Sequence, residues 1–138
     1  MTTTSITREY RWEMGHALLH HKGKCYRPHG HNYRMEIEVS GAVQDDGMVV
    51  DFSDVDDWVE PLIEKYFDHR FWINEEDERF DMDGEVKVDG EPTAENLALW
   101  FWEVWKDFAQ SGHAWPGVTL ERITLYETDR ASATIRRS

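Results

Sequence analysis

The sequence predicts an α+β fold in which a four-stranded antiparallel sheet carries two helices on one face. Apolar and polar residues alternate near both ends of the 138-residue chain, which is the period of a half-buried strand. Two stretches between these ends repeat their apolar residues at the spacing of one helix face. The resulting order, strand-strand-helix-helix-strand-strand, is typical of a sheet with its helices grouped on one side.

The first two predicted strands lie in the N-terminal third of the chain. Residues 10–14 alternate in the first strand, and residues 33–39 alternate in the second, which ends at Gly41. The segment between them, residues 15–32, is long for a hairpin connection and holds five of the seven histidines. Because loops of this length are usually functional or disordered, this segment is a candidate for a site.

Two helices are predicted in the middle of the chain. Ser53 and Asp56 resemble a capping box that opens the first helix, and Pro61 is expected to kink it. Thr93, which follows Pro92, is the predicted N-cap of the second. The apolar faces of the two helices comprise Val55, Trp58, Val59, Leu62, Ile63 and Tyr66, and then Leu97, Ala98, Phe101, Val104, Trp105 and Phe108.

The C-terminal part returns to the strand period. Residues 118–127 form a strand if a bulge brings Val118 and Leu120 onto its apolar face, and residues 131–135 form the last strand. Between the helices, residues 70–91 are acidic and contain a short strand candidate at 86–88. The sequence shows no repeat or second domain, so residues 1–138 are expected to form a single domain.

Charge and composition exclude several classes of partner. The chain has 28 acidic and 15 basic residues, a net charge of −13, and 13% aromatic residues argue against disorder. Residues 44–91 alone hold 18 acidic and 4 basic residues, so the rest of the chain sums to +1. We therefore expect no nucleic-acid partner and no membrane partner, and no apolar run approaches the roughly 18 residues of a transmembrane helix.

Cysteine usage and the N-terminus bear on the compartment. Cys25 is the only cysteine, so the chain forms no internal disulfide, as suits a reducing cytosol. Residues 1–7 lack the charged-then-apolar pattern of a secretory signal. We therefore expect a cytoplasmic protein.

His16, His29 and His31, here called the three-histidine cluster, form the strongest candidate site. His29 and His31 lie two residues apart at the start of a strand and so point to the same face. His16 follows the first strand, so antiparallel pairing brings the three imidazoles together. Three histidines with an open fourth position describe a catalytic zinc site. The alternative is a chance grouping in a polar loop, which is how we interpret His20 and His21.

Cys25 lies four residues before His29, among the bases Lys22, Lys24 and Arg27. A nearby divalent metal and these bases would favour the nucleophilic thiolate. The sequence leaves two alternatives open: a fourth, structural zinc ligand or a small buried apolar residue.

Three further polar residues are candidates for chemistry. Asp68 directly precedes His69, and a carboxylate that orients an imidazole suits proton transfer near neutral pH. Adjacent residues on a strand point apart, so the sequence alone does not show their contact. Glu127 ends an apolar strand face, where it either binds a ligand with several N–H donors or lies at the surface.

Taken together, these motifs resemble one family. Residues 25–33 (CYRPHGHNY), the upstream His16, Asp68-His69, residues 92–97 (PTAENL) and Glu127-Thr128 are similar, in order, to the 6-pyruvoyl-tetrahydropterin synthase / 6-carboxy-tetrahydropterin synthase family. The resemblance covers nearly the whole chain. It implies the tunnelling fold, in which sheets of several subunits join into a barrel, usually a hexamer of two trimers with active sites between subunits.

The resemblance also implies a role for each candidate residue. The three-histidine cluster becomes the zinc site, Cys25 the base, and Asp68 with His69 the proton relay. The residues expected to contact a pterin are Glu127, as its anchor, and Thr93 and Thr128.

The spacing within the cysteine motif sorts the branches of the family. Three residues separate Cys25 from the His-Gly-His of residues 29–31, as is typical of the carboxy-forming branch; the animal pyruvoyl branch typically has five. This resemblance implies a zinc-dependent lyase that converts 7,8-dihydroneopterin triphosphate to 6-carboxytetrahydropterin, acetaldehyde and triphosphate, on the route to queuosine and other 7-deazapurines through preQ0. The alternatives are the pyruvoyl-forming activity and a non-catalytic, zinc-stabilised module in which Cys25 completes the site.

Overall fold

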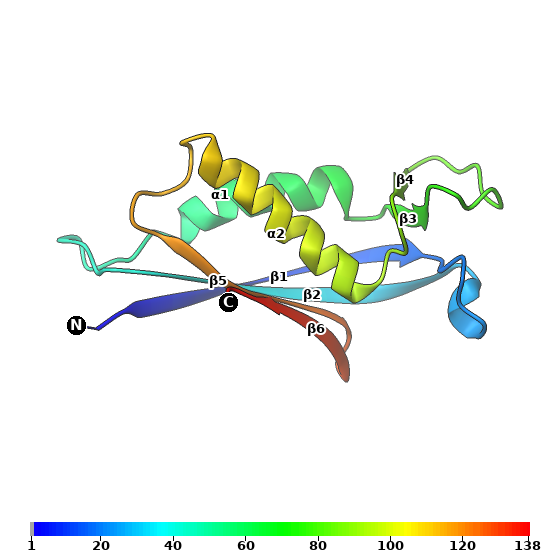
Figure 1. The fold of residues 1–138 in the computed structure, drawn as a ribbon, viewed down its shortest axis with the longest axis horizontal. Coiled ribbons are helices and arrows are strands. Elements are labelled where there is room, and N and C mark those ends of the chain that lie inside the picture. The colour runs from blue at the N-terminus through cyan, green and yellow to red at the C-terminus, as the bar shows by residue number, and fades with distance from the viewer. Residues whose placement is uncertain (1) are drawn as a thin grey trace.

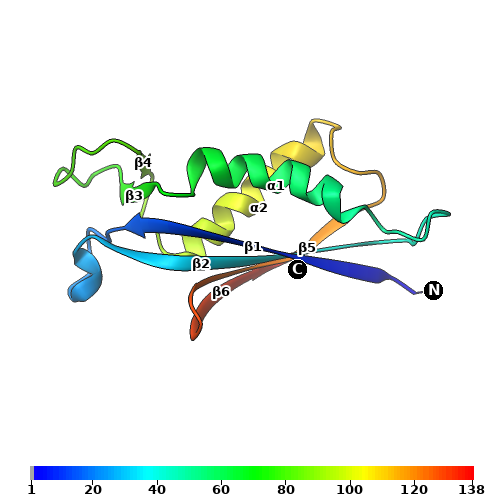
Figure 2. The same ribbon diagram turned by 180° about the vertical axis from the view of Figure 1, so that it is seen from behind.

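The computed structural model describes residues 2–138. Both helices lie on one face of a twisted sheet, as predicted (Figures 1 and 2). The elements follow in the order β1 (Thr4–His16), the short 3-10 helix η1 (Lys24–Tyr26), β2 (His29–Gly41), α1 (Phe52–Tyr66), β3 (Phe71–Asn74), β4 (Glu85–Val88), α2 (Ala94–Gln110), β5 (Thr119–Thr128) and β6 (Ala131–Arg136).

The predicted four-stranded antiparallel sheet is wrong, because the sheet is mixed and has six strands in the order β4-β3-β1-β2-β5-β6. β1, β2, β5 and β6 pair antiparallel, whereas β3 runs parallel to both β1 and β4. The strand candidate at 86–88 is confirmed as part of β4. β3 has no alternation to reveal it, since all four of its residues are buried. Both extra strands lie in the acidic segment 70–91, which the sheet thus ties to the end of β1.

β1 and β2 form a hairpin of two 13-residue strands. Their pairing runs without a shift from Thr4 opposite Gly41 to His16 opposite His29. β1 begins six residues earlier than the alternation predicts, because pairing with β2 extends it through residues whose side chains are largely exposed. Gly15 and His16 also pair with Phe71 and Trp72 of β3, so the end of β1 has a strand on each side.

β5 contains two irregularities that matter for side-chain direction. Its pairing with β2 shifts by one residue at Glu121, which confirms the bulge predicted near Leu120. Its pairing with β6 shifts by one residue at Glu127. Bulges re-aim side chains and are frequent next to active sites, so the second shift marks the end of β5 as a candidate position.

The helix starts follow from local side-chain bonds. The carboxylate of Asp51 accepts a hydrogen bond from the Ser53 backbone N–H at 2.8 Å, so Asp51 is the N-cap of α1, not Ser53 as the capping-box pattern suggests. α1 continues through Pro61 to Tyr66. The Thr93 hydroxyl accepts from the Asn96 N–H at 3.2 Å, which confirms it as the N-cap of α2. No helix among residues 2–138 is long and apolar enough to span a membrane.

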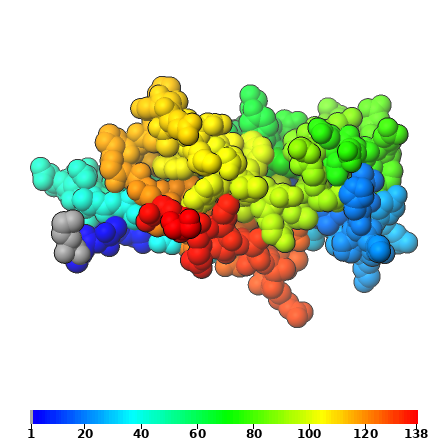
Figure 3. All heavy atoms as spheres, viewed as in Figure 1, coloured from blue at the N-terminus to red at the C-terminus, as the bar shows by residue number. Residues whose placement is uncertain are grey.

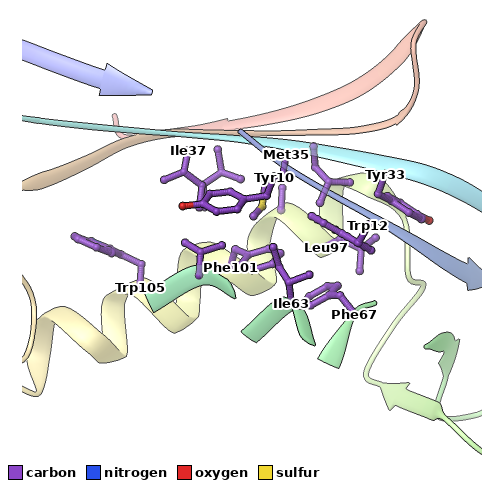
Figure 4. Close-up of a cluster of buried hydrophobic side chains, with 14 of the residues drawn as sticks. Tyr10, Trp12, Tyr33, Met35, Ile37, Ile63, Phe67, Leu97, Phe101 and Trp105 are labelled. Atoms are coloured by element: carbon purple, nitrogen blue, oxygen red, sulfur yellow. The ribbon is translucent and has the colours of Figure 1, made fainter. Parts of the chain in front are cut away.

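The core between sheet and helices is rich in aromatic rings (Figure 4). Phe67 stacks on Phe101 with ring centroids 4.6 Å apart, and Trp12 of β1 meets both rings. The apolar faces predicted for the two helices are confirmed as the surfaces that cover this core, except for Val104, which is not part of it. A second, small cluster lies on the other face of β3 from Trp72, made of Ala17, Phe71 and Ile73 with Phe80 packed on it. The start of the loop after His16 therefore rests on buried apolar side chains.

Candidate metal centre

The strand pairing brings the three-histidine cluster together as expected. His16 ends β1 directly opposite His29, the first residue of β2, and His31 lies two residues further along the same strand. One ligand atom from each ring lies within 4.8 Å of the others. The Nε2 atoms of His16 and His29 are 2.9 Å apart. The cluster thus converges on one point at the end of the sheet.

The hydrogen bonds of the cluster fit a bound cation. His16 Nδ1 lies 2.8 Å from the Pro92 carbonyl, and His29 Nδ1 lies 2.7 Å from the Arg27 carbonyl. Because a carbonyl only accepts, each Nδ1 carries the proton, and the two Nε2 lone pairs of the neutral rings face each other. His31 Nε2 is buried with no hydrogen-bond partner among the described residues. A divalent metal would satisfy all three nitrogens.

Burial keeps these rings in the form that binds metal. Desolvation lowers the pKa of His16 to about 4, and it also lowers the pKa of His31, with the neighbouring His29 as a further cause. Metal coordination requires neutral imidazole, so both rings are ready ligands near neutral pH.

Glu127 lies beside the cluster rather than at a solvated strand end. Its Oε1 is 3.9 Å from His16 Nε2, and its side chain is only 24% exposed. Burial raises the pKa of Glu127, as does the nearby charge of Glu95, while a backbone hydrogen bond from Ala94 partly opposes this. The site therefore contains a half-buried carboxylate that a ligand with N–H donors would stabilise.

Asp68 and His69 make the contact that the sequence alone does not show. His69 has a φ of 59°, the left-handed region, which turns its ring back toward the preceding residue. Its Nδ1 is 2.7 Å from Asp68 Oδ1, and its Nε2 is 3.6 Å from Glu13 Oε2. His69 also lines an open cleft of about 660 Å³ together with His31. His69 thus lies on the rim of a cleft that also reaches His31 of the cluster.

Cys25 stands apart from the cluster. It is half-buried in η1, and the group of metal-ligating side chains found within residues 2–138 comprises the three histidines without it. Its carbonyl accepts from the Leu18 N–H at 2.9 Å, which ties the turn to the end of β1. The candidate ligand group is thus the three histidines alone, with Cys25 outside it.

Both candidate threonines use their hydroxyls locally. Thr93 is half-buried at the start of α2, next to the Pro92 carbonyl that holds His16. Thr128 is the exposed last residue of β5 and accepts from the Arg130 N–H at 3.2 Å. The structure thus places Thr93 near the cluster, whereas Thr128 adjoins it only through its neighbour Glu127.

Two contributors to the site are not among the residues predicted from the sequence. One is the backbone carbonyl of Pro92, which no side-chain motif reveals. The other is Tyr33, a buried residue whose hydroxyl is 3.4 Å from His16 Nδ1 and whose ring stacks on Trp12. Its position two residues after His31, on the same face of β2, is the signal that would identify it.

Fold and site together define a class: an α+β protein with a candidate three-histidine metal centre at the end of a mixed sheet. Comparison with known proteins then gives the family. The sequence model of the 6-pyruvoyl tetrahydropterin synthase family matches residues 5–138, and the chain belongs to this family.

Individual relatives agree with this assignment. A relative from Halobacterium salinarum is 40% identical over 99 residues, 67% of this chain and 63% of that protein. The 6-carboxy-5,6,7,8-tetrahydropterin synthase of Haemophilus influenzae is 38% identical over 78 residues, 54% of this chain and 55% of that protein. The chain thus spans less than two thirds of both relatives. The structure of Caenorhabditis elegans 6-pyruvoyl tetrahydropterin synthase matches with a TM-score of 0.75 at 25% identity, covering 100% of this chain and 98% of that one. The tunnelling fold is therefore confirmed, with the sheet corrected as described above.

Proposed function

We propose that the chain is a zinc-dependent 6-carboxy-5,6,7,8-tetrahydropterin synthase, a lyase acting on 7,8-dihydroneopterin triphosphate. The observation that carries the proposal is the convergence of His16, His29 and His31 beside Glu127, in a chain of the pterin synthase family. The three-residue spacing from Cys25 to His29 and the name of the Haemophilus influenzae relative both favour the carboxy-forming reaction.

The three-histidine cluster would hold zinc through its Nε2 atoms. When bound, zinc supplies a Lewis acid that stabilises developing negative charge on side-chain oxygens of the substrate. The carbonyls of Pro92 and Arg27 fix two of the rings in the ligating tautomer. The chain therefore provides an oriented site with an open position for substrate.

Substrate orientation falls to Glu127. A pterin presents a 2-amino group and a ring N–H side by side, and a carboxylate accepts from both at once. The half-buried position of Glu127, 3.9 Å from His16, would set the pterin ring at a fixed distance from the cluster. Thr93 and Thr128 adjoin this position and are proposed as further contacts of the pterin.

Proton transfer falls to Cys25, Asp68 and His69. Cys25, as thiolate, removes a proton from the substrate side chain. Asp68 holds His69 Nδ1 at 2.7 Å, which leaves Nε2 to carry protons during redox isomerisation and loss of triphosphate. Cleavage of a carbon–carbon bond, with one water molecule consumed over the whole reaction, then releases acetaldehyde and leaves the carboxy-pterin.

The free edges of the sheet support assembly into a homo-oligomer, which we propose is a hexamer of two trimers. Within residues 2–138, β1 pairs with β3 only at Gly15 and His16, so its edge over residues 4–12 is open, as is the outer edge of β6. The face away from the helices carries an ion-pair network in which Arg34 and Arg122 share Glu36. Edges that pair between subunits and a polar open face suit a barrel whose interior is wet.

The identity of the product tests the proposal. Incubation with 7,8-dihydroneopterin triphosphate should yield 6-carboxytetrahydropterin and acetaldehyde. The pyruvoyl-forming activity, which the family name supports as a second candidate, would yield 6-pyruvoyltetrahydropterin without acetaldehyde. A non-catalytic module would yield neither product. We further propose a cytoplasmic role in queuosine or other 7-deazapurine synthesis through preQ0, with no nucleic-acid or membrane partner.

A further inference from the structure

The short helix η1, which carries Cys25, has few attachments to the rest of the chain. None of its three residues is buried, and Gly23 before it provides no side-chain cap. Its internal hydrogen bonds run only between neighbours, such as Tyr26 N–H to the Gly23 carbonyl at 3.2 Å. The Cys25 carbonyl accepts a hydrogen bond from the N–H of Leu18, two residues after the end of β1. Because these bonds are few, a further contact is needed to fix the position of the Cys25 thiol.

Arg79, from the distant acidic segment, supplies that contact. Its Nη1 donates to the Tyr26 carbonyl at 2.6 Å, in the peptide that joins Tyr26 to Arg27. Its guanidinium carbon also lies 3.6 Å from the centroid of the Tyr26 ring, a cation–π arrangement. Arg79 thus contacts both the backbone and the side chain of Tyr26 in η1.

Asp77 holds the guanidinium in place. Arg79 Nε and Nη2 donate to the two carboxylate oxygens of Asp77 at 2.9 and 2.8 Å, and the Arg79 backbone N–H donates to the same carboxylate at 3.1 Å. The Asp77 side chain is 0% exposed. A two-pronged pair of this kind fixes the plane of the guanidinium, so the remaining Nη1 points in one direction.

The segment that presents this pair is itself anchored beside the cluster. Phe80 packs edge-on against Phe71 at 5.0 Å and joins Ala17, the residue after His16, in the small apolar cluster. Figure 3 shows the loop around residues 17–28 and the segment 70–85 together at one end of the molecule. The segment that carries Arg79 is therefore held by apolar packing where it approaches η1.

We infer that Arg79 is a positioning residue that fixes Cys25 and His29 through the backbone of η1. The peptide it holds lies between the Cys25 thiol and the Arg27 carbonyl, and that carbonyl receives the Nδ1–H of His29 at 2.7 Å. The contact from Arg79 would thus position the Cys25 thiol. It would also position the Arg27 carbonyl, which fixes the tautomer of His29, a proposed zinc ligand. The inference rests on the proposed function for the role of Cys25. It also assigns a structural role, the positioning of η1, to part of the acidic segment 70–91.

Arg79→Met tests the inference, with Lys87→Met as the matched control. Lys87 is exposed on β4 in the same acidic segment, so its loss changes the charge equally without touching η1. Since an Ångström-scale misplacement of a reacting group costs up to about 100-fold in rate, Arg79→Met should lower kcat at least about tenfold and change KM by less than about twofold. Lys87→Met should match the wild type.

Alkylation of Cys25 by iodoacetamide provides a readout that does not require turnover. Because Cys25 is the only cysteine, the modification rate against pH reports on this thiol alone. In the zinc-loaded protein, Arg79→Met should shift the rate–pH profile and raise the rate several-fold. Wild-type kcat together with a wild-type alkylation profile would overturn the inference.

Two further variants separate positioning from charge and from folding. Arg79→Lys keeps the charge but loses the planar, two-pronged contact, so it should remain impaired; full recovery would contradict the inference. If Arg79→Met does not fold, Asp77→Asn, which weakens the same pair, should show the same changes to a smaller degree, and no change would count against the inference. If the wild type lacks turnover, the proposed function fails while the alkylation comparison still decides the role of Arg79.

Discussion

His16 and His29 face each other across the β1–β2 hairpin with their Nε2 atoms 2.9 Å apart, and each ring donates its Nδ1–H to a backbone carbonyl. Neither neutral ring has a proton to place between the two Nε2 atoms. Two facing lone pairs repel unless a cation lies beside them, so this geometry makes the hairpin end a candidate metal site.

Metal content distinguishes an open site from one that Cys25 closes. We expect the wild type to retain one zinc ion per chain after dialysis, His31→Ala to lose most of it, and Cys25→Ala to retain it, because Cys25 is not part of the ligand group. His113→Ala, which changes an exposed histidine outside the cluster, is the control. Elemental analysis gives the stoichiometry. Loss of zinc from Cys25→Ala would restore the interpretation of Cys25 as a ligand.

Glu127→Gln should weaken pterin binding without releasing zinc. Hydrogen bonds to a charged group contribute about 1.5–3 kcal/mol, so the Kd for a non-reactive pterin such as biopterin should rise roughly 10- to 100-fold. Glu121→Gln is a matched control, since Glu121 occupies the other irregularity of β5 and pairs with Arg137 instead. Fluorescence titration measures both variants. Equal affinities for the two would exclude Glu127 as the anchor.

Asp68→Asn should lower turnover through His69. Asparagine keeps the shape of the side chain but loses the charge that orients the imidazole and stabilises its protonated form, so kcat should fall about 10- to 100-fold with little change in KM. Asp57→Asn, an exposed change on α1, is the control. Steady-state kinetics provide the measurement. A rise in KM at constant kcat would instead indicate a substrate-binding role.

Asp56 should contribute stability that depends on pH. Its carboxylate accepts from Arg8 and from the Tyr10 hydroxyl, tying α1 to β1, and the Arg8 hydrogen bond holds the pKa of Asp56 below the ordinary 3.8. A depressed carboxylate pKa stabilises the fold above pH 3.8, and that contribution is lost as pH falls through the lowered value. Asp56→Asn should therefore lower the free energy of unfolding at pH 7, with a smaller difference near pH 3. Urea denaturation at both pH values checks this; an equal difference at both would contradict it.

The core should depend strongly on Phe101. This ring is fully buried and stacks on Phe67, so Phe101→Ala should lower the free energy of unfolding by about 3–5 kcal/mol. Leu99→Ala lies on the same helix but removes a side chain that is 42% exposed, and should cost less than about 1 kcal/mol. Chemical denaturation compares them. Equal losses would mean that the core is not organised around α2 as described.

The sequence predicts most of what strand and helix periodicity can encode. Tyr33, Met35 and Ile37 alternate cleanly, so the position of β2 and the meeting of His16 with His29 follow from pattern alone. The position of β3 does not follow from a pattern, because its four residues are all buried and show no alternation of apolar and polar side chains. The N-cap of α1 differs too, since Asp51 competes with Ser53 for the same role and the fold selects Asp51.

Contacts between distant segments are beyond the reach of such patterns. The left-handed φ of His69 lets two adjacent side chains meet, and although histidine adopts this region more often than most residues, the sequence does not specify it at this position. The reach of Arg79 to Tyr26 spans 53 residues and depends on the packing of a segment whose path the sequence leaves open. The chemistry-bearing residues are thus visible in the sequence, while the contacts that orient them require the fold.

Acetaldehyde release per pterin consumed tests the central claim most directly. The zinc-loaded wild type, given 7,8-dihydroneopterin triphosphate, should release one acetaldehyde for each 6-carboxytetrahydropterin formed, and Cys25→Ala should release none while retaining zinc and pterin. Conversion of the substrate by the wild type without acetaldehyde, with 6-pyruvoyltetrahydropterin as product, would contradict the account.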